Sequence, residues 1–69
     1  MLFTDVSSDR AVRAFSKAGF KVITQSKHIG MSDDTHRITI PAHKRLNPYT
    51  LKAIIKSAGL TDTQFKELL

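Results

Sequence analysis

The sequence predicts an α+β fold of two layers, in the order helix, three strands, helix, with a short helix at the C-terminal end. Two observations predict this fold. Apolar residues recur at helical spacing near both ends of the chain, and short segments rich in β-branched residues lie between them. The chain has 69 residues and no cysteine, so we expect a single domain, residues 1–69, whose small core is stabilised by packing alone.

The first helix is expected from Ser8 to Ala18. The segment Ser7-Ser8-Asp9 offers side-chain oxygens for an N-cap and a carboxylate for the first turn. An apolar stripe follows at helical spacing: Ala11, Ala14, Phe15 and Ala18. Gly19 can adopt the left-handed conformation that ends a helix, and Phe20 can then fold back onto Phe15.

Three short strands are expected next, at residues 20–25, 28–32 and 36–40. The first contains the β-branched run 22–24, and Ile38 and Ile40 place apolar side chains on one side of the third. The segment Asp33-Asp34-Thr35 supplies the turn before the third strand, and Pro41 closes that strand because proline cannot donate to a ladder. We therefore expect an antiparallel meander with an apolar sheet face under the helices.

The second helix is expected from Pro48, because Asn47 can act as its N-cap and proline is favoured at the first helical position. Its apolar stripe has the spacing of a buried helix face: Leu51, Ile54, Ile55 and Ala58. Thr61 and Gln64 stand at capping-box spacing and predict a short third helix. The apolar edge of that helix is expected to dock on the core or on a partner: Phe65, Leu68 and Leu69.

The net charge is +5, and the charges are unevenly distributed along the chain. No acidic residue occurs from Arg10 to Ser32 or from Thr35 to Thr61, and every lysine and arginine except Lys66 lies in one of these two stretches. A fold that brings the stretches together presents a positive face, and phosphate backbones are the commonest partner of such a face. A basic surface without a specific partner is the alternative that charge alone leaves open.

The chain has three histidines, which raises the question of a metal site: His28, His36 and His43. Their spacing does not favour one, because no two of them stand four residues apart on a predicted helix and the sequence has no cysteine. We therefore expect no metal and no other cofactor.

Three segments resemble the HicA toxin family of bacterial toxin–antitoxin systems, both in their order and in their spacing. They are VSSDRAVRAFSKAGF at residues 6–20, QSKHI at 25–29 and RITIPAHKRLNPYTLKAIIKSAGL at 37–60. The resemblance implies a fold like that of double-stranded-RNA-binding domains. It also implies metal-independent cleavage of messenger RNA by a toxin that a HicB antitoxin, encoded beside it, neutralises.

The resemblance implies that His28 is the catalytic residue. The family's catalytic histidine follows a Gly-Ser pair directly or after one residue, and Ser26-Lys27-His28 fits the second arrangement. The chain departs from the family at Gln25 and at Tyr49, where glycine is common. An imidazole titrates near pH ~6.5, so it can accept the proton of a ribose 2′-hydroxyl or protonate the leaving oxygen. A surface histidine without a catalytic role is the alternative.

Basic side chains are expected to hold the RNA. Lys27 can stabilise the charge that develops on the phosphorus oxygens. The segment His43-Lys44-Arg45 precedes a helix N-terminus and is interpreted as a phosphate-facing loop, with a solvated loop as the alternative. Lys52 and Lys56 lie on the polar side of the second helix and are expected to contact RNA. The alternative is that they belong to a solvent-exposed helix face without a ligand. The expected RNA-binding set is Lys27, Arg37, His43, Lys44, Arg45, Lys52 and Lys56.

Two other functions remain open from the sequence. A non-catalytic RNA-binding module would use the same basic face and would not need His28. A partner-binding protein would use the apolar C-terminal edge, with its basic charge steering an acidic partner. The apolar runs are short and no signal peptide is recognisable, so we expect a cytoplasmic location without a membrane partner.

Overall fold

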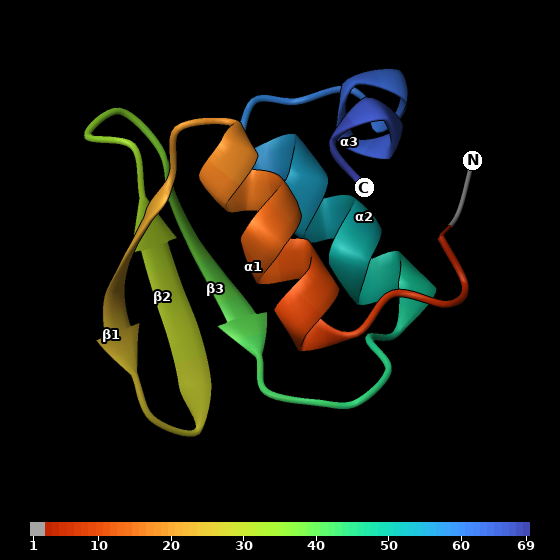
Figure 1. The fold of residues 1–69 in the computed structure, drawn as a ribbon, viewed down its shortest axis with the longest axis horizontal. Helices are drawn as coiled ribbons and strands as arrows, with labels where there is room; N and C mark the ends of the chain where they lie inside the picture. The colour runs from red at the N-terminus through yellow and green to blue at the C-terminus, as the bar shows by residue number, and fades with distance from the viewer. Residues whose placement is uncertain (1–2) are drawn as a thin grey trace.

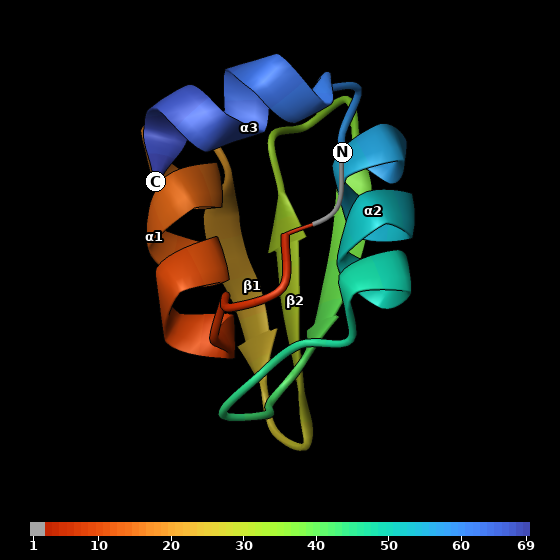
Figure 2. The ribbon, with the colours of Figure 1, turned by 90° about the vertical axis from the view of Figure 1, so that its right-hand side faces the viewer.

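A computed structural model describes residues 3–69 and contains the predicted elements in the predicted order (Figure 1). The elements are α1 (Ser8–Lys17), β1 (Lys21–Gln25), β2 (His28–Ser32), β3 (Arg37–Pro41), α2 (Pro48–Ser57) and α3 (Asp62–Leu68). The strands form an antiparallel sheet in the order β1-β2-β3, and α1 and α2 cover one face of it (Figure 2). The predicted α+β fold with a C-terminal helix is therefore confirmed. None of the helices in residues 3–69 has the length and apolarity that a bilayer crossing requires.

Local capping groups set the ends of α1. The Ser7 hydroxyl accepts a hydrogen bond of 3.2 Å from the backbone N–H of Arg10. Beyond the last turn, Gly19 has a φ of 101°, and the N–H of Phe20 donates to the carbonyl of Phe15 at 3.0 Å. α2 repeats this arrangement, with an asparagine N-cap and a glycine terminator. Both ends of α1 and the N-cap of α2 were predicted, because each depends on residues that are neighbours in the sequence.

The register of the sheet separates a buried face from an open one. Ile29 lies opposite Ile40 and Met31 lies opposite Ile38, and none of these side chains is more than 6% exposed. Residues directly opposite each other point to the same side, so these four face the helices. The register assigns the other side, the open face, to Lys21, Thr24, His28, Gly30, Ser32, Arg37, Thr39 and Pro41.

β1 buries none of its side chains, although we expected an apolar sheet face under the helices. All of its residues are exposed, including Val22 at 44% and Ile23 at 48%. The register with β2 shifts between Val22 and Thr24, which is a bulge on an edge strand. Val22 lies opposite Met31 and shares its side of the sheet but stays 44% exposed on the edge strand. The bulge interrupts the alternation of side chains, so Thr24 lies opposite Gly30 on the open face.

α3 completes the core, which is one of the two outcomes expected for its apolar edge. Phe65 is fully buried, and its ring centroid lies 5.0 Å from that of Phe15 and 5.2 Å from that of Phe3. Leu68 packs against the core in a partly buried position, whereas Leu69 remains 37% exposed. In Figure 2, α3 lies across one end of α1 and α2.

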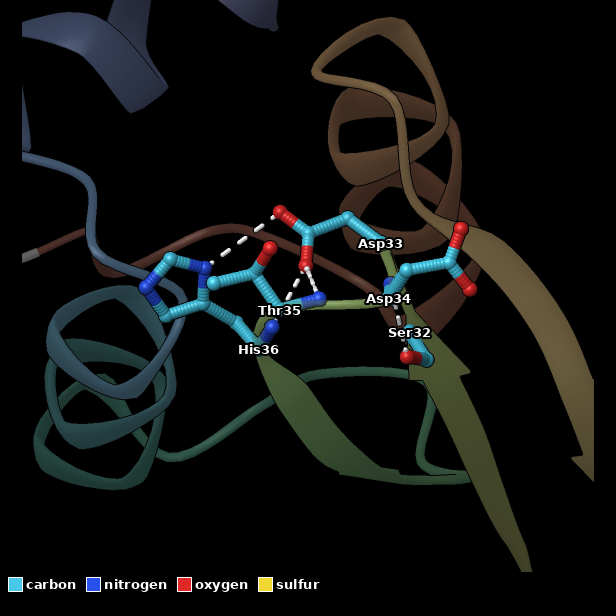
Figure 3. Close-up of polar contacts among 5 residues, drawn as sticks. All are labelled: Ser32, Asp33, Asp34, Thr35 and His36. Carbon is cyan, nitrogen blue, oxygen red and sulfur yellow. Dashed lines mark hydrogen bonds and ion pairs between the residues drawn. The ribbon is translucent and has the colours of Figure 1, made fainter.

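The turn between β2 and β3 is held by one carboxylate, which also positions a histidine (Figure 3). Asp33 accepts hydrogen bonds from the backbone N–H groups of His36 and Thr35, and its Oδ2 lies 3.3 Å from His36 Nδ1. The hydrogen bond from the His36 backbone, with those from Thr35 and the imidazole, holds the pKa of Asp33 below its ordinary value. The imidazole packs against the end of α2, where a Cβ added to Gly59 would lie 2.8 Å from Nε2.

We predict that Gly59→Ala destabilises the protein more than Gly19→Ala does. Both glycines have positive φ, so each alanine costs about 1–2 kcal/mol of backbone strain. A Cβ at Gly19 meets no atom within 4 Å, whereas a Cβ at Gly59 must displace the His36 ring. Urea unfolding of both variants measures the difference. In the His36→Ala background the extra cost at Gly59 should disappear, and equal costs in the wild-type background would contradict the packing described.

We predict that Asp33 contributes to a loss of stability in acid. Its pKa is lowered by folding, so its contribution is complete above the ordinary aspartate pKa of about 3.9 and is lost as the pH falls through the lower, folded value. Asp33→Asn keeps an oxygen that can accept the two backbone hydrogen bonds but does not titrate. Its unfolding free energy, measured by urea titration, should therefore fall less steeply below pH ~4 than that of the wild type. Asp34→Asn measures the effect of removing one negative charge from the same turn.

Candidate active site

His28 lies at the first position of β2, the central strand, and is exposed on the open face. The register places it opposite Pro41, the last residue of β3. The turn before it consists of Ser26 and Lys27, and the N–H of Ser26 donates to the carbonyl of His28 at 3.1 Å. The imidazole is therefore carried on a hydrogen-bonded strand end and is accessible to a ligand.

The loop between β3 and α2 lies at the same end of the sheet as His28. The N–H of Ala42 donates to the carbonyl of Lys27 at 3.4 Å, so the start of this loop touches the β1–β2 turn. Figure 1 shows both the turn and the loop below the sheet. The next three residues of the loop are exposed. The fold thus gathers five of the predicted site residues at one end: Lys27, His28, His43, Lys44 and Arg45.

The loop is fixed to the segment that leads into α1. The N–H of Ser8 donates to the carbonyl of His43 at 3.1 Å, and the N–H of Leu46 donates to the carbonyl of Val6 at 2.8 Å. Leu46 is also buried, with 1% of its surface exposed. These contacts hold the backbone of the loop on both sides of Lys44, so its cationic side chains project from a defined position.

Asp5 is an acidic residue at this end that the charge pattern did not predict as part of the site. Its carboxylate lies 3.4 Å from the guanidinium of Arg45, and the two side chains are 84% and 74% exposed. An ion pair this exposed contributes about 0–1 kcal/mol. Arg45 can therefore exchange its ion pair with Asp5 for one with a phosphate at little cost in free energy.

The fold does not bring the other three predicted RNA-binding residues to His28. Arg37 is on the open face but at the opposite end of the sheet, because it pairs with Ser32, four residues and about 13 Å along β2 from His28. Lys52 and Lys56 are exposed on α2, and Lys56 is in its last turn, away from the loop that precedes the helix. An RNA that reached all three would have to extend well beyond His28.

Two threonines lie on the open face between His28 and Arg37 and were not among the predicted site residues. Thr24 and Thr39 flank Gly30, and the Thr24 hydroxyl occupies the space that a side chain at Gly30 would need. Thr39 could have been found from the sequence, since it alternates with the apolar positions of its strand. Thr24 could not, because its orientation depends on the bulge in β1.

Tyr49 is a further residue that the prediction of the site did not include. It follows Pro48 in the first turn of α2 and is 72% exposed. In the sequence, the one feature that sets Tyr49 apart is that it stands where glycine is common in the family that the chain resembles. Exposed aromatic rings can stack on unpaired bases.

The chemistry available at the His28 end is proton transfer beside positive charge. His28 carries a titratable imidazole, and Lys27, Lys44 and Arg45 supply cations that can face a phosphate. His36 takes no part, because it lies in the turn at the other end of β2 and is paired with Asp33. Within residues 3–69, no group of three or more His, Asp or Glu side chains is arranged to hold a metal ion.

Comparison with known proteins identifies a family for this chain. No curated protein matches it. Residues 8–60 match the family model described as the HicA toxin of bacterial toxin–antitoxin systems. The match runs from α1 to the end of the turn after α2, so it includes the His28 end and stops before α3. Since this is most of the chain, the protein belongs to the HicA toxin family.

Proposed function

We propose that this toxin is a metal-independent endoribonuclease that cleaves messenger RNA and that a HicB-type antitoxin neutralises. The observation that carries the proposal is the position of His28, exposed on the open face, at the end where the β1–β2 turn and the basic loop meet. The family match supports the toxin role and the antitoxin partner.

In the proposed reaction His28 moves the proton. As general base, its imidazole takes the proton of a ribose 2′-hydroxyl while the 2′-oxygen forms a bond to the adjacent phosphorus. The bond from phosphorus to the 5′-oxygen of the next nucleotide breaks, and that oxygen takes up a proton. The products are a 2′,3′-cyclic phosphate and a 5′-hydroxyl. DNA lacks the 2′-hydroxyl and would not be cleaved.

The cations around His28 have a separate role in the proposal. Negative charge accumulates on the phosphorus oxygens as the 2′-oxygen attacks, and donors fixed in advance stabilise that charge. Lys27 precedes His28, and Lys44 and Arg45 stand on a loop whose backbone is fixed at both sides. Arg37, Lys52 and Lys56 would contact more distant phosphates, and His43 would contact a phosphate near His28.

We predict that His28→Ala abolishes cleavage and leaves the fold intact. The side chain is exposed, so its removal creates no cavity, and the unfolding free energy should change by no more than about 0.5 kcal/mol. Purified protein is incubated with a long single-stranded RNA and a chelator, and the product ends are analysed for 2′,3′-cyclic phosphate. RNA binding by the variant should persist.

His36→Ala is the matched control for that experiment, because it removes an imidazole from the opposite end of β2. It should retain cleavage at temperatures where it is folded. Cleavage by His28→Ala, or loss of wild-type cleavage on chelation, would contradict the mechanism. RNA binding by a wild type that never cleaves would instead indicate a non-catalytic RNA-binding module.

We predict that Lys44→Ala combined with Arg45→Ala weakens binding to all RNA sequences alike. Both residues are exposed on the loop beside the β1–β2 turn, and in this proposal they contact phosphates, which position RNA without reading its sequence. The slope of log affinity against log salt should become shallower by about 0.7 for each phosphate that the variant no longer neutralises. Fluorescence anisotropy at several salt concentrations measures both effects. Lys66→Ala, on α3, is the control, and a changed sequence preference in the double variant would argue against a backbone role.

A further inference from the structure

Residues of α1 and α3 line a basic groove. Figure 2 shows these two helices on the helix side of the sheet, and His28 is on the open face. Its volume is about 220 Å³. The lining is half cationic and half apolar: Arg10, Arg13, Lys17, Ala14, Leu68 and Leu69. The acidic residues on the same two helices, Asp9, Asp62 and Glu67, do not line it. None of these residues is part of the site proposed for RNA.

The cations of the groove are not neutralised by carboxylates within residues 3–69. Arg10 donates to the backbone carbonyl of Asp5 at 3.1 Å, and Lys17 donates to the backbone carbonyl of Leu68 at 3.2 Å. These hydrogen bonds orient the two side chains and leave their charges unpaired. Arg13 forms no hydrogen bond or ion pair with any residue in this range. The groove therefore presents three available positive charges along one side.

The apolar side of the groove indicates what kind of anion fits. Ala14 is buried, Leu68 is partly buried, and Leu69 exposes 37% of its surface at the rim. A nucleic-acid backbone would satisfy the cations but would leave these aliphatic groups without a contact. A peptide segment that carries carboxylates beside an aliphatic side chain would satisfy both sides.

We infer that this groove binds the antitoxin, through a short amphipathic segment that carries two or more carboxylates and an aliphatic side chain. The carboxylates pair with Arg10 and Arg13, and the aliphatic side chain packs on Leu69. The inference rests on the toxin–antitoxin part of the proposed function and not on RNA cleavage. α3 lies outside residues 8–60, so the family match covers the α1 side of the groove but not Leu68 and Leu69.

The test is the affinity of the full-length chain for the purified antitoxin encoded beside it, measured by calorimetry. Arg13→Glu should raise the Kd by about tenfold or more, because it places like charges in contact. Leu69→Ser should also weaken binding, without any change of charge. Lys66→Glu is the matched control: it makes the same charge reversal on α3 outside the groove and should change the Kd by less than about twofold. All three positions are exposed, and melting curves verify that each variant is folded.

RNA assays without antitoxin decide between the two kinds of partner. Unchanged RNA affinity in Arg13→Glu, together with weaker antitoxin binding, is the expected result. Wild-type antitoxin affinity in both Arg13→Glu and Leu69→Ser would overturn the inference. Loss of RNA affinity in Arg13→Glu at unchanged antitoxin affinity would assign the groove to RNA instead. The antitoxin Kd can be measured whether or not the chain cleaves RNA, so a failure of the proposed nuclease activity would be recognised separately.

Discussion

The fold depends on the burial of Phe65 against Phe15. A chain of 69 residues without disulfides has a small core, and two helices on a three-stranded sheet leave one end of that core open. α3 closes this end with a single fully buried aromatic ring, which contacts Phe15 from α1 and Phe3 from the segment before it. The chain's four phenylalanines are all in or against this core, since Phe20 packs on Phe15 at 5.7 Å. Aromatic pairs of this kind add about 0.5–1.5 kcal/mol beyond the area that they bury.

The position of the candidate active site follows from the same packing. Burial of Val6 and Leu46 brings the segment before α1 beside the loop before α2, and backbone hydrogen bonds join the two segments. That loop in turn contacts the β1–β2 turn through Ala42 and Lys27. The catalytic candidate His28 therefore sits where three irregular segments are tied together by backbone contacts, so exposed functional side chains stand on a rigid framework.

The structure gathers two groups of cations on separate surfaces. Cations around His28 occupy one end of the sheet, and those of α1 line a groove with α3 on the helix layer. A toxin must bind its substrate and must also be recognised by its inhibitor. If these two contacts use separate basic surfaces, a substitution that changes one contact leaves the other intact. The acid-free stretches of the sequence contain both sets of cations but do not show that they are separated.

The sequence by itself determined the elements and their order, and it determined their ends to within one residue, since β3 includes Pro41, which was expected to follow it. Caps, turns and helical stripes depend on residues within a few positions of each other. It also singled out His28 and the loop at residues 43–45, although only through a resemblance in the case of His28. The tertiary structure alone decided that β1 is exposed, that Arg37 stands far from His28, and that Asp5 pairs with Arg45. It also decided that Arg13 and Leu69 share a groove. Each of these depends on strand register or on contacts between distant segments, which local patterns in a single sequence do not encode.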